Sequence, residues 1–579
     1  MSKLNRKWLP VLILVLVLTA ALSAACADEL SERFQAKAAL LQAEIVTEEY
    51  AEALGDAPAG AAGYAVFFSV CDGNKRASVL NGTGESLSEA WDAAVARASE
   101  AVEAKALEPR WVKADVVYNA WQTNAELVRD ELSKALPGFD FNGIALDDHF
   151  ETALLEGELN GAGIYDYEEK ELSLELLNAY LKKTGRETLE ALPYNLTAFE
   201  CKGWFCDEND AIYPLIDEGA DCGRRVLTSL DADYARDLID TASAFLAGQV
   251  NADGSFVYGL HPQYDRKLSS YNIVRHSGTV WSLVCRYRMF RDEALVETIE
   301  KTIDYMLSQL KYDDDGAAYL YESKTDEIKL GGCGIAVVAM TEYMDVFRNE
   351  KYRDVCVALG EGILKQMDPE TGGYWHVLAG DLSRKEEFRT VYYDGEATFA
   401  LARLYGLTGD QRWLDAACRA VEHFIEGDYT QYRDHWVSYS LNEVTKYVED
   451  RQDFYDFALA NATDNFSKIQ DRARTFPTNL ELLISCFETW QRMVERGVDT
   501  GDFDLQQLLD TISSRANRQL SGYFYPELAM YMKRPGRVLG AFMIRNDRFR
   551  VRIDDVQHNI GGFYLYWKNY DALVQAGMK

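Results

Sequence analysis

Carboxylates and histidines gather at a few short polar stretches in the second half of the chain. The stretches that carry acids are Asp313-Asp314-Asp315, Asp394-Gly395-Glu396, Asp434-His435-Trp436 and Asp554-Asp555 with His558. Hydrolysis of a glycosidic bond needs two carboxyl groups, one protonated toward the leaving oxygen and one ionised to activate water or to attack directly. These residue types therefore favour acid–base chemistry by carboxylates.

Two of the acids, Asp394 and Glu396, stand two residues apart at the start of an expected helix. This spacing separates the side chains by about 200° around a helix, so we do not expect both to face one cleft. Asp394 could instead cap the helix, and Asp434 has the same ambiguity. Our hypothesis is a catalytic pair with one carboxylate from each of two stretches. The candidates are Asp394 or Glu396, together with Asp554 or Asp555.

Arg275 and His276 follow Tyr271 and offer a different chemistry. A histidine here could be the general base that lyases and epimerases use on uronic acids, with the arginine neutralising the carboxylate. Alternatively, His276 is a hydrogen-bonded structural residue of a turn. We keep His276 as a catalytic candidate, and Tyr271 and Arg275 as substrate-binding candidates.

Other aromatic and imidazole side chains accompany these stretches, and five of the seven histidines fall at or near them. The further substrate-binding candidates are Trp375, His376, Asp434, His435, Trp436 and His558. The sequence contains no H-E-x-x-H stretch and no pair of histidines four residues apart, so it predicts no metal and no cofactor.

The elements that must position these residues are helices. From Asp231 onward, apolar residues recur at spacings of three and four, as in Val355, Leu359 and Ile363, which is typical of amphipathic helices. The expected helices cover 231–248, 276–290, 293–310, 333–348, 351–367, 394–407, 410–426, 434–449, 453–461, 478–496, 503–517 and 556–573.

Similar glycine-aromatic turns separate pairs of these helices. Turns that begin at residues 253, 315 and 372 are 62 and 57 residues apart, and a related turn lies at 522–525. A repeat of this length holds about one helical hairpin with its connections. Each hairpin can then bury the apolar face of its neighbour, and about twelve helices paired in this way would close into a ring.

The stretch Tyr392-Tyr-Asp-Gly-Glu-Ala-Thr-Phe-Ala-Leu-Ala-Arg-Leu-Tyr405, followed by Thr408-Gly-Asp-Gln-Arg-Trp-Leu-Asp-Ala-Ala417, resembles the hairpin units of the six-hairpin glycosidase-like superfamily. The similarity covers about residues 225–575 and implies an (α/α)6 toroid. The superfamily includes glycoside hydrolases, polysaccharide lyases and sugar epimerases. The resemblance is therefore specific for the fold and not for the reaction.

The residues ahead of the toroid predict a smaller α+β domain. Apolar strands at 63–71 and 76–80 flank an Asp-Gly-Asn turn, and a helical pattern follows at 86–105. Further strands are expected at 111–117 and 143–146, with a helix at 124–136 between them. The expected protein is multidomain, with a signal peptide at 1–27, an α+β domain at 28–225 and the all-α toroid at 226–579.

The first 27 residues have the pattern of an export signal. A basic start precedes an apolar run from Trp8 to Leu22, which ends in small residues. Cys26 follows Ala24-Ala25, as in a bacterial lipoprotein signal, although Ala25-Cys26-Ala27 also fits ordinary cleavage. We expect an exported protein of the cell envelope, lipid-anchored through Cys26 or otherwise secreted or periplasmic, with that anchor as its only membrane contact.

The formal charge of −33 makes a nucleic acid an unlikely partner, since phosphate backbones would be repelled. Ten cysteines are too few for a disulfide scaffold. We expect buried free thiols in the helices and one disulfide among Cys201, Cys206 and Cys222.

From these features together we expect an exported glycoside hydrolase that acts on an extracellular or cell-surface polysaccharide or oligosaccharide. One alternative is a polysaccharide lyase or sugar epimerase that uses His276 and Arg275. The other is a non-catalytic surface toroid that binds a glycan or a protein.

Overall fold

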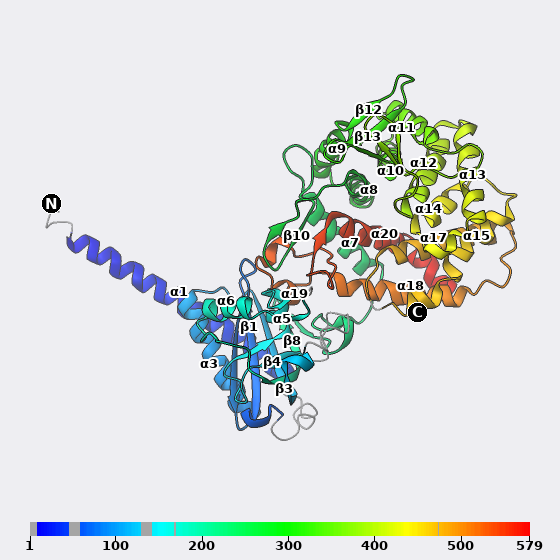
Figure 1. Cartoon of the computed structure of the whole chain (residues 1–579). Helices are drawn as coiled ribbons and strands as arrows, with labels where there is room; N and C mark the ends of the chain where they lie inside the picture. Colours follow the sequence, from blue (N-terminus) through cyan, green and yellow to red (C-terminus); the bar gives the residue numbers. More distant parts are fainter. Residues whose placement is uncertain (1–8, 46–57, 129–141, 167–168, 473) are drawn as a thin grey trace.

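The chain folds into an α+β domain and an all-α toroid that lie side by side (Figure 1). The structure is a computed structural model that describes residues 9–45, 58–128, 142–166, 169–472 and 474–579, with side chains from residue 27 onward. The expected fold class, a toroid preceded by a smaller α+β domain, is confirmed.

An antiparallel sheet forms the centre of the N-terminal domain, in the strand order β2-β1-β3-β8-β4-β5, with β9 paired to β8. The strands are β1 (Tyr64–Cys71), β2 (Ser78–Gly84), β3 (Trp111–Asn124), β4 (Gly143–Ala145), β5 (Ala153–Leu155), β8 (Asn195–Cys206) and β9 (Ile212–Pro214). The hairpin that the sequence predicts is the β1–β2 pair, and the helix after it is α3 (Leu87–Lys105). The helix expected at 124–136 falls largely outside the described residues.

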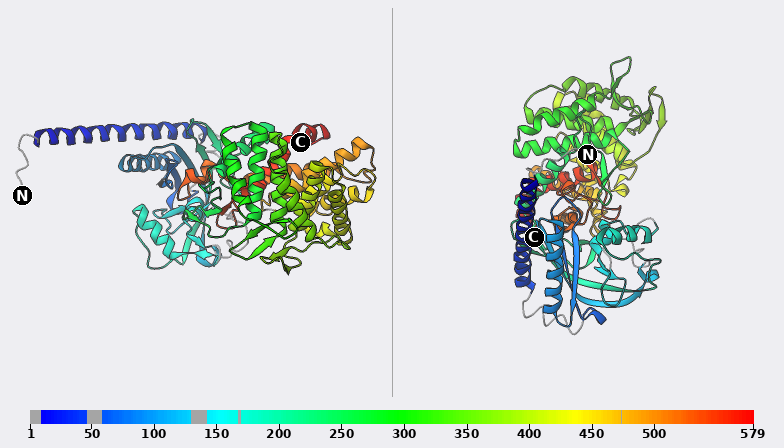
Figure 2. Two further views of the ribbon diagram at one scale, coloured as in Figure 1. Left: turned by 90° about the horizontal axis from the view of Figure 1, so that it is seen from above. Right: turned by 90° about the vertical axis from the view of Figure 1, so that its left-hand side faces the viewer.

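Strand β1 is apolar except for Ser69, because both of its faces are covered. Val66 and Phe68 point to one side, where they pack against α3 and against α1 (Leu9–Ile45). Ala65 and Phe67 point to the other side, where they join a cluster that includes Tyr531 of the toroid. Seen from above (Figure 2, left), the first half of α1 extends away from both domains.

Twelve helices of the C-terminal domain form two concentric rings. The inner helices are α8 (Ile273–Phe290), α10 (Leu330–Phe347), α12 (Tyr392–Thr408), α14 (His435–Val444), α17 (Thr478–Arg496) and α20 (Ile553–Ala576). Each inner helix packs against the next in this order, and α20 packs against α8, so the ring closes. This arrangement is the (α/α)6 toroid that the sequence resemblance implied.

The outer helices alternate with the inner ones along the chain. They are α7 (Ala232–Ala247), α9 (Ala294–Leu307), α11 (Arg353–Lys365), α13 (Gln411–Glu426), α15 (Gln452–Thr463) and α18 (Leu505–Gln519). A short helix, α16 (Phe466–Gln470), escaped the sequence prediction because five residues are too few to show a period. Side-chain caps start several helices, such as Asp231 for α7 and Asp410 for α13.

One inner helix, α10, is apolar around its circumference from Leu330 to Met340, with Glu342 and Asp345 near its end. By length and composition it is the one helix among the described residues that could cross a membrane, and 89% of that stretch is buried inside the protein. Because the inner ring is enclosed by the outer one, a helix there needs no polar face. Its apolar character is that of a core helix.

Short strands and turns cover the end of the ring at which the inner helices begin. One sheet has the order β12-β13-β14-β15-β16, with β12 at Leu310–Tyr312, β13 at Ala318–Glu322, β14 at Glu327–Lys329, β15 at Val377–Ala379 and β16 at Arg384–Glu386. The smaller sheet has the order β11-β10-β17, with β10 at Gly259–His261, β11 at Arg266–Lys267 and β17 at Val551–Arg552. The stretches at Arg275, Asp394, Asp434 and Asp554 lie at this end because they begin inner helices, whereas Asp313-Asp314-Asp315 forms the turn between β12 and β13. The toroid therefore brings residues far apart in the chain to one place.

Candidate active site

A pocket of about 220 Å³ opens where α8, α12, α14 and α20 begin. Its polar lining includes two carboxyl groups, Glu396 and Asp554, together with Arg275 and His558. Tyr392, Tyr393 and Trp436 add aromatic surface. The pocket thus holds one candidate carboxylate from each of the two stretches that the sequence hypothesis paired.

Glu396 lies in the second turn of α12 and is 4% exposed. Its Oε2 atom has no hydrogen-bond partner within the described part of the chain. Burial, followed by the nearby Asp434 carboxyl, raises the pKa of Glu396 well above its usual range. Burial therefore favours the protonated form of this side chain, the form that can donate a proton into the pocket.

Glycines of α10 make the room that Glu396 occupies. A Cβ added to Gly331 would lie 1.8 Å from Glu396 Oε2, and one added to Gly334 would lie 2.8 Å from the Glu396 carbonyl oxygen. No side chain fits at such distances, so α10 and α12 approach closely only because these positions are glycine. The glycines let the carboxyl group reach the pocket wall.

Asp554 lies in the first turn of α20 and stays ionised. Arg275 Nε donates to its Oδ2 at 2.8 Å, and Arg552 Nη2 donates to the same oxygen at 2.7 Å. Burial alone would raise the pKa of Asp554, but Arg275 and Arg552 outweigh it and lower the pKa below its usual value. Arg275 also donates to the Tyr258 hydroxyl at 2.6 Å.

The neighbouring Asp555 does not line the pocket. Its carboxylate accepts from Arg550 at 3.3 Å and from Arg552 at 3.5 Å. Burial and the charge of Asp554 raise its pKa to about 7. Of the two adjacent aspartates, Asp554 faces the pocket.

Asp394 is buried away from the pocket lining, beside His376 and Tyr429. Its Oδ1 lies 3.1 Å from His376 Nε2, and its Oδ2 accepts from the Tyr429 hydroxyl at 3.2 Å. His376 Nδ1 accepts from the backbone N–H of Arg389 at 2.9 Å, and Arg389 lines the pocket. Asp394 and His376 therefore hold the segment that leads into α12.

The N-cap alternative differs between the two aspartates. It is wrong for Asp394, since α12 starts after Val391 and has no side-chain cap. It is confirmed for Asp434, whose Oδ1 accepts from the Trp436 backbone N–H at 2.9 Å. Asp434 itself is fully buried and its other oxygen has no hydrogen-bond partner among the described residues.

The structure separates His276 from Arg275. His276 is fully buried, with Nδ1 2.8 Å from the Tyr271 hydroxyl and Nε2 2.9 Å from the Thr302 carbonyl oxygen. Burial lowers its pKa to about 4. Neither His276 nor Tyr271 lines the pocket, so their hydrogen bonds serve the packing behind it. Trp375 also lies outside the lining, where Arg384 stacks over its ring at 4.5 Å.

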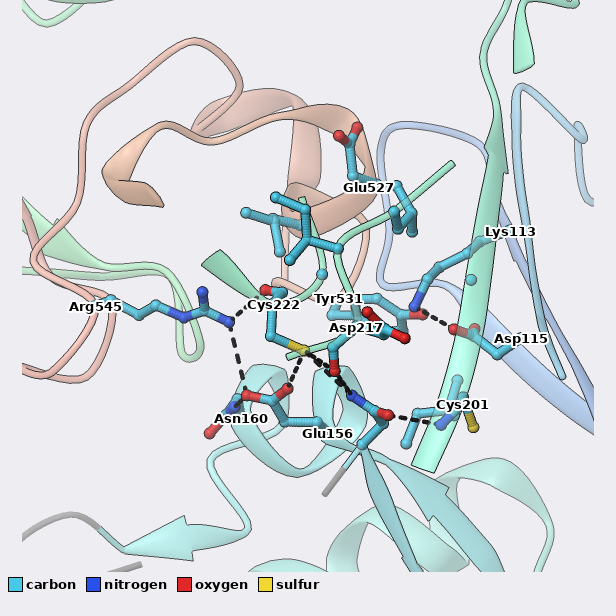
Figure 3. A pocket seen from close by; sticks show the side chains of 18 of the residues that line it. Lys113, Asp115, Glu156, Asn160, Cys201, Asp217, Cys222, Glu527, Tyr531 and Arg545 are labelled. Atoms are coloured by element: carbon cyan, nitrogen blue, oxygen red, sulfur yellow. Dashed lines mark hydrogen bonds and ion pairs between the residues drawn. The ribbon is translucent and has the colours of Figure 1, made fainter. Parts of the chain in front are cut away.

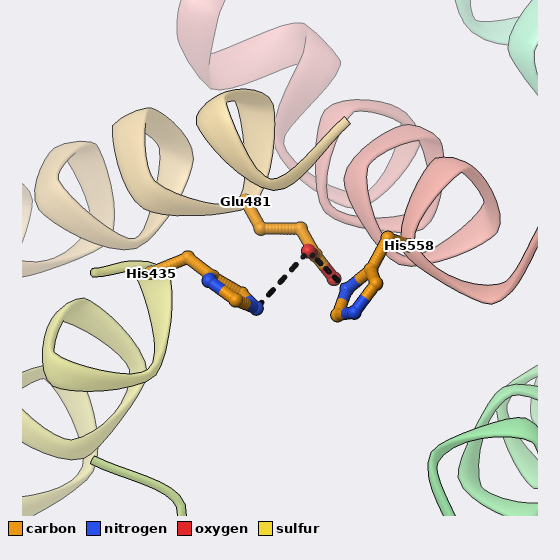
Figure 4. A group of neighbouring side chains, drawn as sticks. All are labelled: His435, Glu481 and His558. Carbon is orange, nitrogen blue, oxygen red and sulfur yellow. Dashed lines mark hydrogen bonds and ion pairs between the residues drawn. The ribbon is translucent and has the colours of Figure 1, made fainter. Parts of the chain in front are cut away.

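His435 and His558 meet beside Glu481 of α17 (Figure 4). His558 Nδ1 lies 2.8 Å from Glu481 Oε2, and His435 Nε2 lies 3.8 Å from the same oxygen. Glu481 was not among the candidates from the sequence. It follows Thr478-Asn479-Leu480 and so lies near the start of an inner helix, a position that Glu396 and Asp554 share. The sequence analysis also missed the pocket-lining Arg389 and Gln557.

A second pocket, of about 60 Å³, lies between the two domains (Figure 3). It is lined by the Lys113–Asp115 ion pair and Glu156 of the N-terminal domain and closed by Tyr531 and Arg545 of the toroid. At roughly 10–15 Å³ for each water, it holds a few waters and not a sugar ring. We therefore do not place the reaction here.

The disulfide expected near this second pocket is wrong. Cys201, Cys206 and Cys222 are all free and buried. Cys222 Sγ accepts from Asn142 Nδ2 at 3.2 Å, and Cys206 Sγ lies 3.6 Å from Lys37 Nζ, so each thiol has polar neighbours of its own. Burial raises the pKa of the Cys222 thiol far above its usual value, which makes it a poor nucleophile.

No family model and no curated protein matches the chain. Solved structures with a similar fold include D-mannose isomerase, at 10% identity and a TM-score of 0.46 over 59% of this chain and 100% of that one. Cellobiose 2-epimerase from Bacillus thermoamylovorans B4167 is 12% identical, with a TM-score of 0.46 over 58% and 99% of the two chains. An unsaturated glucuronyl hydrolase specific for heparin is 11% identical, with a TM-score of 0.42 over 58% and 98%. The function must therefore be argued from the side chains.

Proposed function

We propose that the protein is a carbohydrate-active enzyme, and specifically a glycoside hydrolase. The observation that carries the proposal is the opposite tuning of two carboxyl groups in one pocket. Burial raises the pKa of Glu396, whereas Arg275 and Arg552 lower the pKa of Asp554. Carboxyl groups whose environments push their pKa values apart are the acid and the base of a glycosidase.

In the proposed reaction, Glu396 donates its proton to the glycosidic oxygen as that bond breaks. Asp554 either takes a proton from the attacking water or attacks the sugar carbon itself. Arg275 keeps Asp554 ionised throughout. The rings of Tyr392 and Trp436, which also line the pocket, offer apolar surface for the faces of a sugar.

The test is a panel of neutral and uronic-acid glycans incubated with the wild-type protein, Glu396→Gln and Asp554→Asn. We expect new reducing ends from the wild type on at least one glycan, and a rate lower by about 10²- to 10⁴-fold in each variant. Glu443→Gln is the matched control, since Glu443 is also buried on an inner helix but lies near the opposite end, beside Lys446. Equal rates in Glu396→Gln and the wild type would contradict the proposal.

A second candidate is a lyase or epimerase, because Arg275 and an imidazole, that of His558, line the same pocket. In this mechanism His558 takes a proton from the substrate. The sequence analysis gave that role to His276, which lies in the core. A lyase would give unsaturated products that absorb in the near ultraviolet, and an epimerase would incorporate solvent deuterium without new reducing ends. Binding without any product would favour the non-catalytic glycan-binding toroid.

We also propose that the substrate is a polysaccharide outside the cytoplasm and that Cys26 carries a lipid anchor. The basic start, the apolar run and Cys26 after two alanines support export. The side chain of Cys26 lies outside the described residues. Detergent-phase partitioning of the mature protein tests the anchor: the wild type should enter the detergent phase and Cys26→Ala should not. If both the wild-type protein and Cys26→Ala stayed in the aqueous phase, lipidation of Cys26 would be excluded.

A further inference from the structure

Three side chains from three inner helices converge beside the pocket: His435 of α14, Glu481 of α17 and His558 of α20. One ligand atom from each lies within 4.8 Å of the others. Figure 4 shows both imidazole rings directed toward the same carboxylate. His435 and Glu481 are almost fully buried, whereas His558 is 17% exposed and lines the pocket.

His435 is the anomalous member of this group. It is 1% exposed, and neither ring nitrogen has a hydrogen-bond partner within the described part of the chain. Its Nδ1 lies 3.4 Å from Asp434 Oδ1, but the angles do not make a hydrogen bond. Native proteins seldom leave a buried polar side chain without a partner, so a ligand at Nε2 would remove an unfavourable feature.

We propose that His435 Nε2, a carboxylate oxygen of Glu481 and His558 Nδ1 bind one divalent transition metal, with zinc as the reference ion. Two imidazoles and one glutamate form a donor set of catalytic zinc sites, which leave the fourth position open. Calcium and magnesium prefer oxygen ligands alone, so the nitrogens argue against them. Because His558 lines the pocket, a metal bound here would lie beside it.

The groups around these three residues suit a metal site. The Tyr439 hydroxyl donates to Glu481 Oε1 at 3.1 Å, which fixes the carboxylate. Asp434 Oδ1 lies 3.4 Å from His435 Nδ1, so a small rotation of the ring on metal binding would let it accept a hydrogen bond from Nδ1–H. Metal-binding histidines commonly have such a carboxylate behind them. A Cβ at Gly561 would lie 2.3 Å from Glu481 Oε1, so this glycine keeps the space open.

This inference is independent of the proposed hydrolase chemistry, since neither Glu396 nor Asp554 belongs to the donor set. Without metal, His558 Nδ1 and Glu481 Oε2 share a hydrogen bond at 2.8 Å. A metal would displace the proton of that bond, so binding should release protons. The enthalpy of binding should then depend on the ionisation enthalpy of the buffer.

The experiment is a calorimetric titration of the full-length, chelator-treated protein with zinc chloride, repeated in two buffers. We expect one ion per chain and a buffer-dependent enthalpy. Cobalt chloride provides a second readout, since a tetrahedral site gives intense visible d–d bands. No stoichiometric binding of either ion by the wild-type protein would overturn the proposal.

Variants locate the site. Glu481→Gln should abolish stoichiometric binding while nearly preserving the shape of the side chain. Asp434→Asn keeps an N-cap residue for α14 and should weaken binding about 10- to 100-fold, the usual effect of losing an outer partner. His149→Ala, at an exposed turn of the N-terminal domain, is the matched control and should bind as the wild type does. Unchanged binding by Glu481→Gln would place the metal elsewhere.

One further variant separates this proposal from the hydrolase. Glu396→Gln should lose turnover and still bind zinc. A protein that binds zinc at these residues but cleaves no glycan would retain the metal site and lose the hydrolase proposal. A protein that cleaves glycans but binds no zinc would retain the hydrolase proposal and lose the metal site.

Discussion

At the scale of single residues, the pocket depends on charges that lie just outside it. Glu396 and Asp554 are both buried carboxyl groups, and burial alone would raise the pKa of both. Asp554 has arginines in contact, Arg275 and Arg552, and its pKa is lowered instead. In the proposed reaction, the difference between acid and base therefore comes from two guanidinium groups.

The first prediction concerns the pH profile of kcat/KM. Activity needs Asp554 ionised and Glu396 protonated, so it should rise through the lowered pKa of Asp554 and fall through the raised pKa of Glu396. In Arg275→Gln the acid limb should move to higher pH, because Arg275 contributes most to lowering that pKa. Arg384→Gln, which changes an arginine outside the pocket, should leave the limb in place. If the acid limb of the profile did not move in Arg275→Gln, Arg275 would not be what lowers the pKa of Asp554.

The second prediction concerns Asp555, whose folded-state pKa is raised to about 7. A carboxyl with a raised folded pKa stabilises the fold fully below its unfolded pKa, near 3.9, and this contribution is lost as the pH rises toward 7. The wild-type protein should therefore lose stability relative to Asp555→Asn between about pH 4 and pH 7. Urea denaturation across this range measures the difference. A difference independent of pH would argue against the raised pKa.

At the scale of elements, the site is built by the starts of inner helices. The sequence predicted these helices well because amphipathic period and polar starts are local signals. It named Asp394 or Glu396, with Asp554 or Asp555, as a possible pair for the same reason, and the choice within each stretch needed the pocket lining. It could not assign His276 or Asp394 to the interior, since their partners, Thr302 and Tyr429, lie 26 and 35 residues further along the chain.

Glu481 is a site residue that could not be recognised from the sequence. Its Leu-rich surroundings read as an ordinary amphipathic helix, and nothing local marks the glutamate as a neighbour of His558, 77 residues further on. Packing of consecutive inner helices brings α17 and α20 together. Closure of the ring brings α20 against α8, which explains why Arg275 of α8 meets Asp554, 279 residues away.

The third prediction tests the close approach of α10 and α12. Gly334→Ala should lower the free energy of unfolding by about 1–3 kcal/mol, because its Cβ would lie 2.8 Å from the Glu396 carbonyl oxygen. Gly248→Ala is the control: the nearest atom to its Cβ would be 3.4 Å away, and its φ of −67° suits alanine. Denaturant unfolding compares the two variants. Equal stability of the two would show that the helices can separate without cost.

At the scale of the whole molecule, the two domains share buried contacts. Arg225, at the end of the N-terminal domain, donates from Nη2 and Nε to Glu527 of the toroid at 2.7 and 2.9 Å. The Tyr531 hydroxyl lies 2.8 Å from Ser69 Oγ inside the N-terminal domain. Such contacts make the N-terminal domain a support that is packed against the toroid.

The fourth prediction follows from the burial of the Arg225–Glu527 pair, whose side chains are 12% and 0% exposed. Arg225→Met leaves Glu527 as an unpaired buried charge and should cost about 3–5 kcal/mol. Arg412→Met, in the exposed Arg412–Glu361 pair, should change stability by about 1 kcal/mol or less. Thermal unfolding should show one transition that moves down in Arg225→Met. Two transitions, with only one moved, would mean that the domains unfold separately.

The assignment of Glu396 as the acid and Asp554 as the base is tested most directly by measuring reducing ends from a glycan panel. The wild-type protein, Glu396→Gln and Asp554→Asn are compared. We expect cleavage of at least one glycan by the wild type, loss of cleavage in both variants, and retained glycan binding and folding. Glu443→Gln should cleave as the wild type does. Cleavage by the wild type that persists in either pocket variant would contradict the assignment of Glu396 and Asp554 as the acid and the base.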